Sequence, residues 1–244
     1  MQHRTIDYRI DYLAADGRKR GQEFCTLTSH HDGRRTLRAR SEIFGAEVLR
    51  DVIYTVDAAF RPIDALIRVS MQDRFVGSGW FRFTDMLAEC ESQTAAEGRL
   101  SQRIELAAPA ASFITHAVAS DVWHGASIVK SQDLGAQMIG TVLSASPLHN
   151  GSSGPSLGHW PLQAHYLGCE PVETPAGRFE AEHVRYEELS GELFLETWCT
   201  ADTNRIMLKM YYPPYDSSYV LAAIGPETTS GSSETPAAQP RGET

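Results

Sequence analysis

Histidines gather in the middle of the chain, where they could perform acid–base chemistry. Five of the nine lie between residues 116 and 165. His116 and His124 fall in a segment with helical spacing, and Asp121 precedes His124 by three residues, a separation that lets two side chains meet on a helix. An aspartate beside an imidazole orients the ring and stabilises its cation. We expect His116, Asp121 and His124 to form a general acid–base centre; the alternative is that they are exposed or hydrogen-bonded structural residues.

A glycine- and proline-rich segment, residues 147–161, carries two further catalytic candidates. Long loops in compact domains are often functional, and His149 and His159 bracket this one. We expect one or both of them to close over the acid–base centre, the alternative being ordinary surface positions. Three tryptophans are candidates for the apolar, substrate-binding walls of the site or, alternatively, for plain core residues: Trp80, Trp123 and Trp160.

No motif points to a metal ion or a cofactor. The chain has no P-loop, no GxGxxG following a strand, no HExxH and no GxSxG. The candidate histidines lack the short-range spacing typical of metal ligands, and the four cysteines lie far apart without a CxxC pair. We therefore predict that the protein uses neither a metal nor a cofactor.

Composition restricts the class of protein. A length of 244 residues with 42% hydrophobic content suits one globular domain with a sizeable core. The formal net charge of -9 argues against nucleic acid as a partner, because phosphate binding needs clustered Lys and Arg. No apolar run has the length of a membrane span, and the first residues lack a signal-peptide pattern. We expect a cytoplasmic protein.

The elements that must position these residues are mostly strands. Ile6, Tyr8, Ile10 and Tyr12 alternate with polar residues, as is typical of a half-buried strand. Residues 109–125 instead show steps of three and four and predict one helix. Residues 226–244 hold no large apolar residue and predict a disordered tail after a single domain at residues 1–225. The further strands are predicted at residues 24–29, 36–43, 48–56, 63–71, 75–84, 100–106, 164–172, 177–186, 193–200, 206–211 and 219–224.

The C-terminal strands also carry a resemblance. The chain reads G-x-E-x-V-x-T-P-A-G-x-F from Gly168 to Phe179 and then W-x-x-x-D-x-x-R-I from Trp198 to Ile206. This pattern resembles a lipoprotein-carrier-like β-clamp family of largely uncharacterised bacterial proteins. The resemblance implies a strongly curved antiparallel sheet, a half-open barrel that closes around a helix or plug and encloses an apolar cavity. It implies no catalytic residues, and the family's usual export contrasts with the expected cytoplasmic location.

Two functions follow from these observations. The first is a cofactor-independent enzyme that binds a small, mainly apolar and possibly aromatic metabolite and performs histidine-based lyase or isomerase chemistry. The second is a non-catalytic carrier of a hydrophobic metabolite or lipid, in which the histidines would be dispensable. Unpaired edges of an open sheet tend to become covered, which favours a homodimer.

Overall fold

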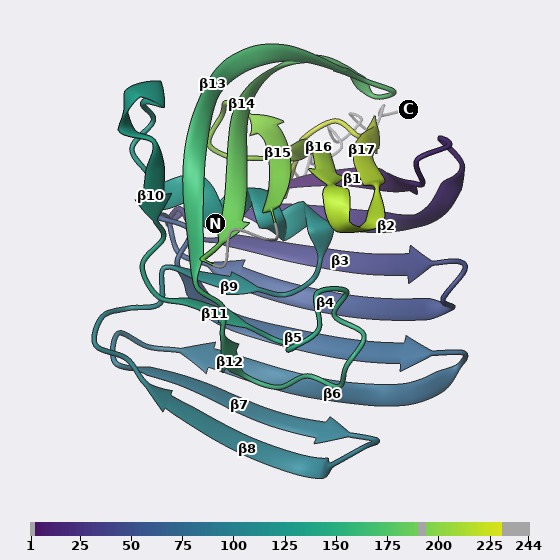
Figure 1. Ribbon diagram of the computed structural model, residues 1–244, viewed down its shortest axis with the longest axis vertical. Helices are drawn as coiled ribbons and strands as arrows, with labels where there is room; N and C mark the ends of the chain where they lie inside the picture. The colour runs from purple at the N-terminus through teal and green to yellow at the C-terminus, as the bar shows by residue number, and fades with distance from the viewer. Residues whose placement is uncertain (1–2, 190–193, 231–244) are drawn as a thin grey trace, which may run out of the picture.

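One large antiparallel sheet dominates the computed structural model, which describes residues 3–189 and 194–230. Its 15 strands follow the order β10-β13-β14-β15-β16-β17-β1-β2-β3-β4-β5-β6-β7-β8, and β18 pairs with β1. The sheet curls so that the β13–β17 arm faces the β3–β8 arm, while its ends stay unjoined (Figure 1). The predicted class, a mainly β protein with a strongly curved, half-open sheet, is confirmed.

The strands of the large sheet are β1 His3–Leu13, β2 Lys19–Ser29, β3 Arg35–Ile43, β4 Val48–Val56, β5 Pro62–Met71, β6 Arg74–Phe83, β7 Leu87–Thr94, β8 Gly98–Glu105, β10 Ala136–Met138, β13 Leu162–Thr174, β14 Gly177–Glu188, β15 Phe194–Thr200, β16 Met207–Tyr212, β17 Ser217–Ile224 and β18 Thr228–Ser230. A small sheet contains β9 Ser112–Ile114, β11 Val142–Ser144 and β12 Gly158–His159. The 3₁₀ segments are η1 Val118–Ser127, η2 Gln132–Leu134 and η3 Pro213–Tyr215.

Buried and exposed side chains alternate along the strands, so that one face of the sheet is buried and apolar. In β4, Val52 and Tyr54 point inward and are buried, whereas Leu49 and Ile53 point outward and are exposed. Successive residues of a strand point to opposite faces, so the inward set of each strand forms one continuous core. Because the face toward the interior is apolar, a register slip of one residue would expose it, and the pairing is therefore firmly specified.

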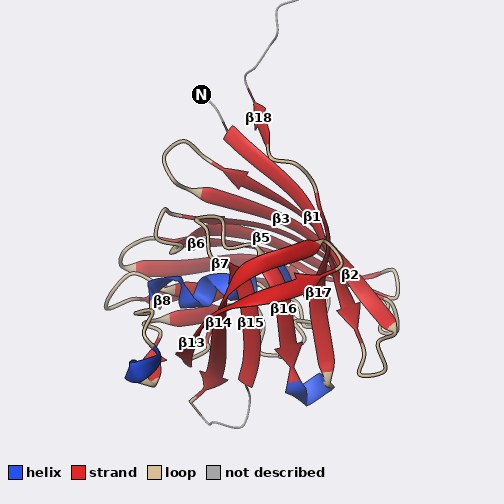
Figure 2. Ribbon diagram, turned by 90° about the horizontal axis from the view of Figure 1, so that it is seen from above, coloured by secondary structure: helices blue, strands red, loops and turns tan. Residues whose placement is uncertain are grey.

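A plug fills the space between the two arms of the sheet. We use this name for residues 112–127, which comprise β9 and η1 (Figure 2). Phe113 is fully buried against Phe81 and Phe83, with ring centroids 4.9 and 4.8 Å away. Offset and tilted aromatic contacts at this spacing stabilise a core beyond the area they bury. The plug is thereby packed onto the β3–β8 arm.

The predicted helix at residues 109–125 is wrong in its first half. Residues 112–114 form β9, which pairs in parallel with β11, and the helical part begins only at Val118 and is a 3₁₀ helix. His116 interrupts any helix, because its backbone adopts φ +62°, in the left-handed region. The apolar residues of this segment are therefore spaced as in a helix because the segment is buried on several sides. They do not form one continuous amphipathic stripe.

Two other differences concern a strand and the domain boundary. Strand β7 was not expected, because its inward residues are the small Ala88, Cys90, Ser92 and Thr94, which leave no visible apolar period. Strand β18 extends the sheet beyond the domain boundary predicted at residue 225, and residues 231–244 of the predicted tail lie outside the described part of the chain. Within that described part, no helix is long and apolar enough to cross a bilayer.

Candidate functional site

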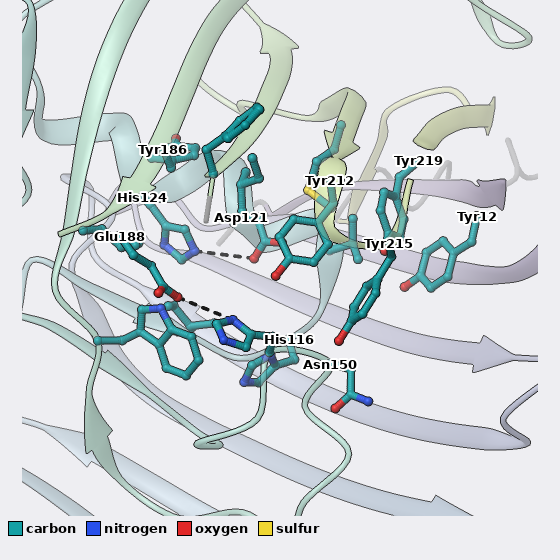
Figure 3. A pocket seen from close by; sticks show the side chains of 18 of the residues that line it. Tyr12, His116, Asp121, His124, Asn150, Tyr186, Glu188, Tyr212, Tyr215 and Tyr219 are labelled. Carbon is teal, nitrogen blue, oxygen red and sulfur yellow. Dashed lines mark ion pairs between the residues drawn. The ribbon is translucent and has the colours of Figure 1, made fainter. Parts of the chain in front are cut away.

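A cavity of about 150 Å³, partly open to solvent, lies between the plug and the β13–β17 arm. The strands β1, β2 and β4 form its floor with Tyr12, Arg20 and Arg50. Tyr212, Tyr215 and Tyr219 crowd one end (Figure 3). At the other end lie the histidines and carboxylates considered below. Large aromatic walls with a few convergent polar groups are typical of small-molecule sites.

Asp121 and His124 meet at the cavity wall, as their spacing on a helical segment predicts. The Nε2 atom of His124 lies 3.4 Å from Oδ1 of Asp121, and its Nδ1 atom lies 2.5 Å from Oγ of Ser112. Since a carboxylate only accepts hydrogen bonds, the neutral tautomer that suits both neighbours has its proton on Nε2 and accepts from the Ser112 hydroxyl at Nδ1. Both ring nitrogens are therefore engaged within the protein.

From the sequence we expected Asp121 to orient His124, which would act as the acid or base. The geometry favours the opposite roles. His124 is only 3% exposed, and both of its ring nitrogens face protein atoms, Asp121 and Ser112. The side chain of Asp121 is 13% exposed, lines the cavity and keeps acceptor capacity beyond the His124 contact. Asp121 is accordingly the group that can receive a proton, and His124 is the residue that positions it.

His116 lines the cavity as a neutral imidazole. Burial, and secondarily the positive charge of Arg50, lower its pKa to about 3. Its Nε2 atom lies 3.3 Å from Oγ of Ser144, and its carbonyl oxygen accepts a hydrogen bond from Nη1 of Arg50. A ring held uncharged near neutral pH is a weak base and a hydrogen-bonding wall, so a role as proton donor does not fit it.

His149 forms a second polar pair, on the loop side of the cavity. Its Nδ1 atom lies 3.4 Å from Oε1 of Glu188, and its ring meets the edge of Trp160 with centroids 4.8 Å apart. All three residues line the cavity. The structure therefore brings together four of the five predicted catalytic residues and one of the three predicted tryptophans.

The remaining three candidates lie elsewhere. His159 is exposed on β12 and lines an adjoining surface depression, which shares His149, Trp160 and Glu188 with the cavity. Trp80 is 40% exposed on the outer face of β6, because the inward parity of that strand is taken by Phe81 and Phe83. Trp123 is buried in the core, where its Nε1 donates to the carbonyl of Arg205. None of these three contributes to the cavity wall.

Buried charges on the floor hold the plug in place, and sequence reasoning missed them. The fully buried Glu23 carboxylate accepts hydrogen bonds from the amides of Val118 and Ala119 at 3.1 and 2.9 Å, where η1 begins. It also accepts from the hydroxyls of Tyr12 and Ser41, each at 2.7 Å. Main-chain groups of an irregular buried segment need such partners.

Arg50 performs a similar task for the neighbouring loop. Its guanidinium donates to the carbonyl oxygens of His116, Asn150 and Gly151 at 2.7 to 3.0 Å. A sequence signal for both charges existed. Glu23 and Arg50 occupy the same strand parity as buried apolar neighbours, where a charged side chain is unusual. Among residues 3–189 and 194–230, no group of three or more His, Cys, Asp or Glu side chains is arranged to hold a metal ion.

Comparisons with known proteins show a likeness of fold. No family model and no curated protein sequence matches the chain. A β-barrel-like protein of the domain of unknown function DUF1849 from Brucella abortus superposes with a TM-score of 0.51 at 12% identity, covering 91% of this chain and 96% of that one. A DUF1089 family protein from Pseudomonas aeruginosa gives a TM-score of 0.43 at 12% identity, covering 79% and 90%.

A looser likeness is to a protein from Bacteroides fragilis described as exported, with a YmcC-like fold, at a TM-score of 0.33, 9% identity and coverage of 91% and 95%. TM-scores below 0.5 carry no argument about this chain. The DUF1849 likeness, at 12% identity, identifies a shared β-barrel-like architecture without a shared function. The chain is thus similar in fold to a bacterial β-barrel-like protein of a domain of unknown function.

Proposed function

We propose that the chain is a cofactor-independent enzyme that binds a small, mainly apolar, aromatic metabolite in the cavity and catalyses an acid–base reaction of the lyase or isomerase type. The observation that carries this proposal is the Asp121 carboxylate, held by His124 at 3.4 Å and directed into a cavity with aromatic walls. A positioned base inside a partly water-excluding pocket is what proton abstraction from a carbon atom requires.

The proposed step balances within the substrate and Asp121. The carboxylate takes a proton from a substrate carbon, and the electron pair of that C–H bond forms a new carbon–carbon double bond. In an isomerase the displaced π pair moves on and is protonated at a second carbon, with Asp121 returning the proton. In a lyase the electron pair of the C–H bond forms the double bond while a group on the neighbouring carbon leaves with the electron pair of its own bond to that carbon. His149, which lies beside Glu188, lines the same cavity and is the candidate for protonating a departing group.

Turnover of a panel of small aromatic and terpenoid metabolites tests the proposal. For any substrate found, Asp121→Asn should lower kcat by about 100-fold or more, the usual contribution of a general base. His124→Ala should lower it less, because His124 positions the base. His159→Gln, on the exposed surface, should leave it unchanged. Equal turnover by wild type and Asp121→Asn would remove the catalytic role assigned to that carboxylate.

A carrier function is the second candidate, and the apolar character of the walls favours it. Ile114, Leu162, Leu195 and Met210 line the cavity together with the tyrosines. The resemblance of the C-terminal strands to lipoprotein-carrier-like proteins points the same way. For a carrier of a hydrophobic metabolite or lipid, ligands would bind without turnover. Asp121→Asn and His124→Ala would then bind them as tightly as wild type.

A further inference from the structure

The cationic side chains of the cavity lie together on its floor. Arg20 on β2 and Arg50 on β4 both line it. The guanidinium of Arg20 packs over the rings of Tyr219 and Tyr12, 5.2 and 5.8 Å from their centroids, and its Nη2 donates to the Tyr219 hydroxyl at 2.6 Å. Arg50 is only 3% exposed. Two permanent positive charges therefore border the tyrosine end of the cavity.

No anion of the protein is committed to these charges. Among the described residues, Arg20 and Arg50 take part in no ion pair, and their side-chain hydrogen bonds go to a hydroxyl and to backbone carbonyls. The two carboxylates that line the cavity, Asp121 and Glu188, lie beside His124 and His149 instead. Burial of a guanidinium without a counter-charge is costly, so this floor favours an incoming anion.

Glu23, a further carboxylate that acts on Arg50, already accepts hydrogen bonds at both of its oxygens. Glu23 and Asp121 both influence Arg50 electrostatically, yet the oxygens of Glu23 accept five hydrogen bonds, from two hydroxyls, two backbone amides and the Cys25 thiol. Donor capacity, by contrast, remains on both arginines. Arg50 makes three hydrogen bonds to carbonyls and a guanidinium offers five N–H groups. In the described structure Arg20 uses only Nη2, which donates to Tyr219, so Nη1 remains for a ligand, whereas its Nε is buried.

We infer that the ligand of this cavity is an amphiphilic organic acid, whose single oxyanion head is bound by Arg20, in the positive field of Arg50, and whose aromatic body lies among the tyrosines. The inference rests on the proposed function, since it requires that an apolar molecule enters this cavity. A carboxylate, sulfonate or phosphate head would use the same guanidinium geometry. Asp121 lines the same cavity beside His124, where its carboxylate faces the body of the ligand.

A matched pair of fluorescent probes tests the head group. 8-Anilinonaphthalene-1-sulfonate and N-phenyl-1-naphthylamine share an aromatic body and differ in the sulfonate. We expect wild type to bind the sulfonate at least about 10-fold more tightly than the neutral probe, as charge-assisted hydrogen bonds allow. Arg20→Met should abolish that preference without weakening the neutral probe. Arg20→Lys should restore part of it, because it keeps the charge.

Arg40→Met provides the control, since Arg40 is exposed on the outer face of β3 and the variant loses the same charge. It should keep the wild-type preference, with circular dichroism confirming that each variant is folded. Equal affinities of the two probes for wild type, or a preference that survives Arg20→Met, would overturn the assignment of the head group alone. Failure of both probes to bind would overturn the cavity-binding proposal and this inference with it.

Discussion

Replacing Glu23 with glutamine should loosen the plug, because one carboxylate joins it to the wall. Oε2 of Glu23 accepts from the Tyr12 hydroxyl, the Ser41 hydroxyl and the Val118 amide, and Oε1 accepts from the Ala119 amide. Glutamine keeps one acceptor oxygen and turns the other into an NH₂ donor. If the oxygen stays with its three donors, the new NH₂ faces the Ala119 N–H, which is left without an acceptor, and only the weakly accepting sulfur of Cys25 remains as a partner for the NH₂.

The expected loss in the free energy of unfolding follows from these changes in hydrogen bonding. A buried donor without an acceptor costs about 1 to 3 kcal/mol, and the three hydrogen bonds that remain lose the assistance of the negative charge. We therefore expect Glu23→Gln to lower the free energy of unfolding by about 3 kcal/mol. With an m-value of about 3 kcal/mol/M for a chain of this size, the urea midpoint should fall by about 1 M.

Urea unfolding followed by circular dichroism measures this loss, and hydrogen exchange locates it. Glu91→Gln is the matched control, since Glu91 is an exposed glutamate of β7 that accepts from Ser101 on the outer face. Its effect should stay within about 0.5 kcal/mol. The amides of Val118 and Ala119 should exchange faster in Glu23→Gln alone. Equal midpoints for the two variants would refute the idea that Glu23 holds the plug.

Two further outcomes test the neighbourhood of His116. Gly151→Ala should destabilise the protein by about 1 to 3 kcal/mol in urea unfolding, because residue 151 has φ +62° and a Cβ there would lie 2.5 Å from Cγ of His116. Gly45→Ala is the control and should be near neutral, since no atom lies within 4 Å of its new Cβ. Equal losses of stability in the two variants would contradict the steric argument. Because His116 has a folded-state pKa of about 3, below its ordinary 6.5, its neutral form favours folding above pH 6.5, and that stability is lost as the pH falls toward 3. His116→Gln should therefore show a flatter decline of the urea midpoint over this range, and a decline as steep as that of wild type would exclude His116 as a contributor.

Much of the sheet could be predicted from sequence because its two faces differ in polarity. Val48–Val56 alternates buried and exposed residues over its whole length, and the predicted bounds of that strand are those observed. Strand β7 escaped prediction because its inward side chains are small. The small residues Gly77 and Gly79 of β6 leave room for the long loop. A Cβ at either position would lie 2.7 to 2.9 Å from Pro155 of the long loop, which packs against β6 there.

The site was predictable only where local spacing decides which residues meet. Asp121 and His124 are three residues apart on one helical segment, and their contact follows from that spacing alone. The roles within the pair depend on Ser112, which lies on β9 and occupies the second ring nitrogen. Tyr12, Arg20 and Arg50 reach the cavity from strands far away in sequence. Their convergence depends on the curl of the sheet, which a strand pattern does not specify.

Most of the buried charges of the interior serve the backbone of the plug, and this sets Arg20 apart. Glu23 binds amides at the start of η1, Arg50 binds the carbonyl of His116, and Arg205 binds the carbonyl of Val122. A short 3₁₀ segment inside a curled sheet cannot pair its main chain with the strands, so charged side chains from the wall satisfy it.

Asp121 therefore projects from a backbone fixed on both sides, which makes a preformed cavity that does not depend on ligand-induced closure. In the described structure, Arg20 makes no such bond to the plug; its one side-chain hydrogen bond goes to Tyr219. A guanidinium that lines a cavity, stacks on aromatic rings and supports no main-chain group is free to bind a ligand. For this reason the structural role that explains Glu23, Arg50 and Arg205 does not extend to Arg20, and an anionic ligand accounts for it better.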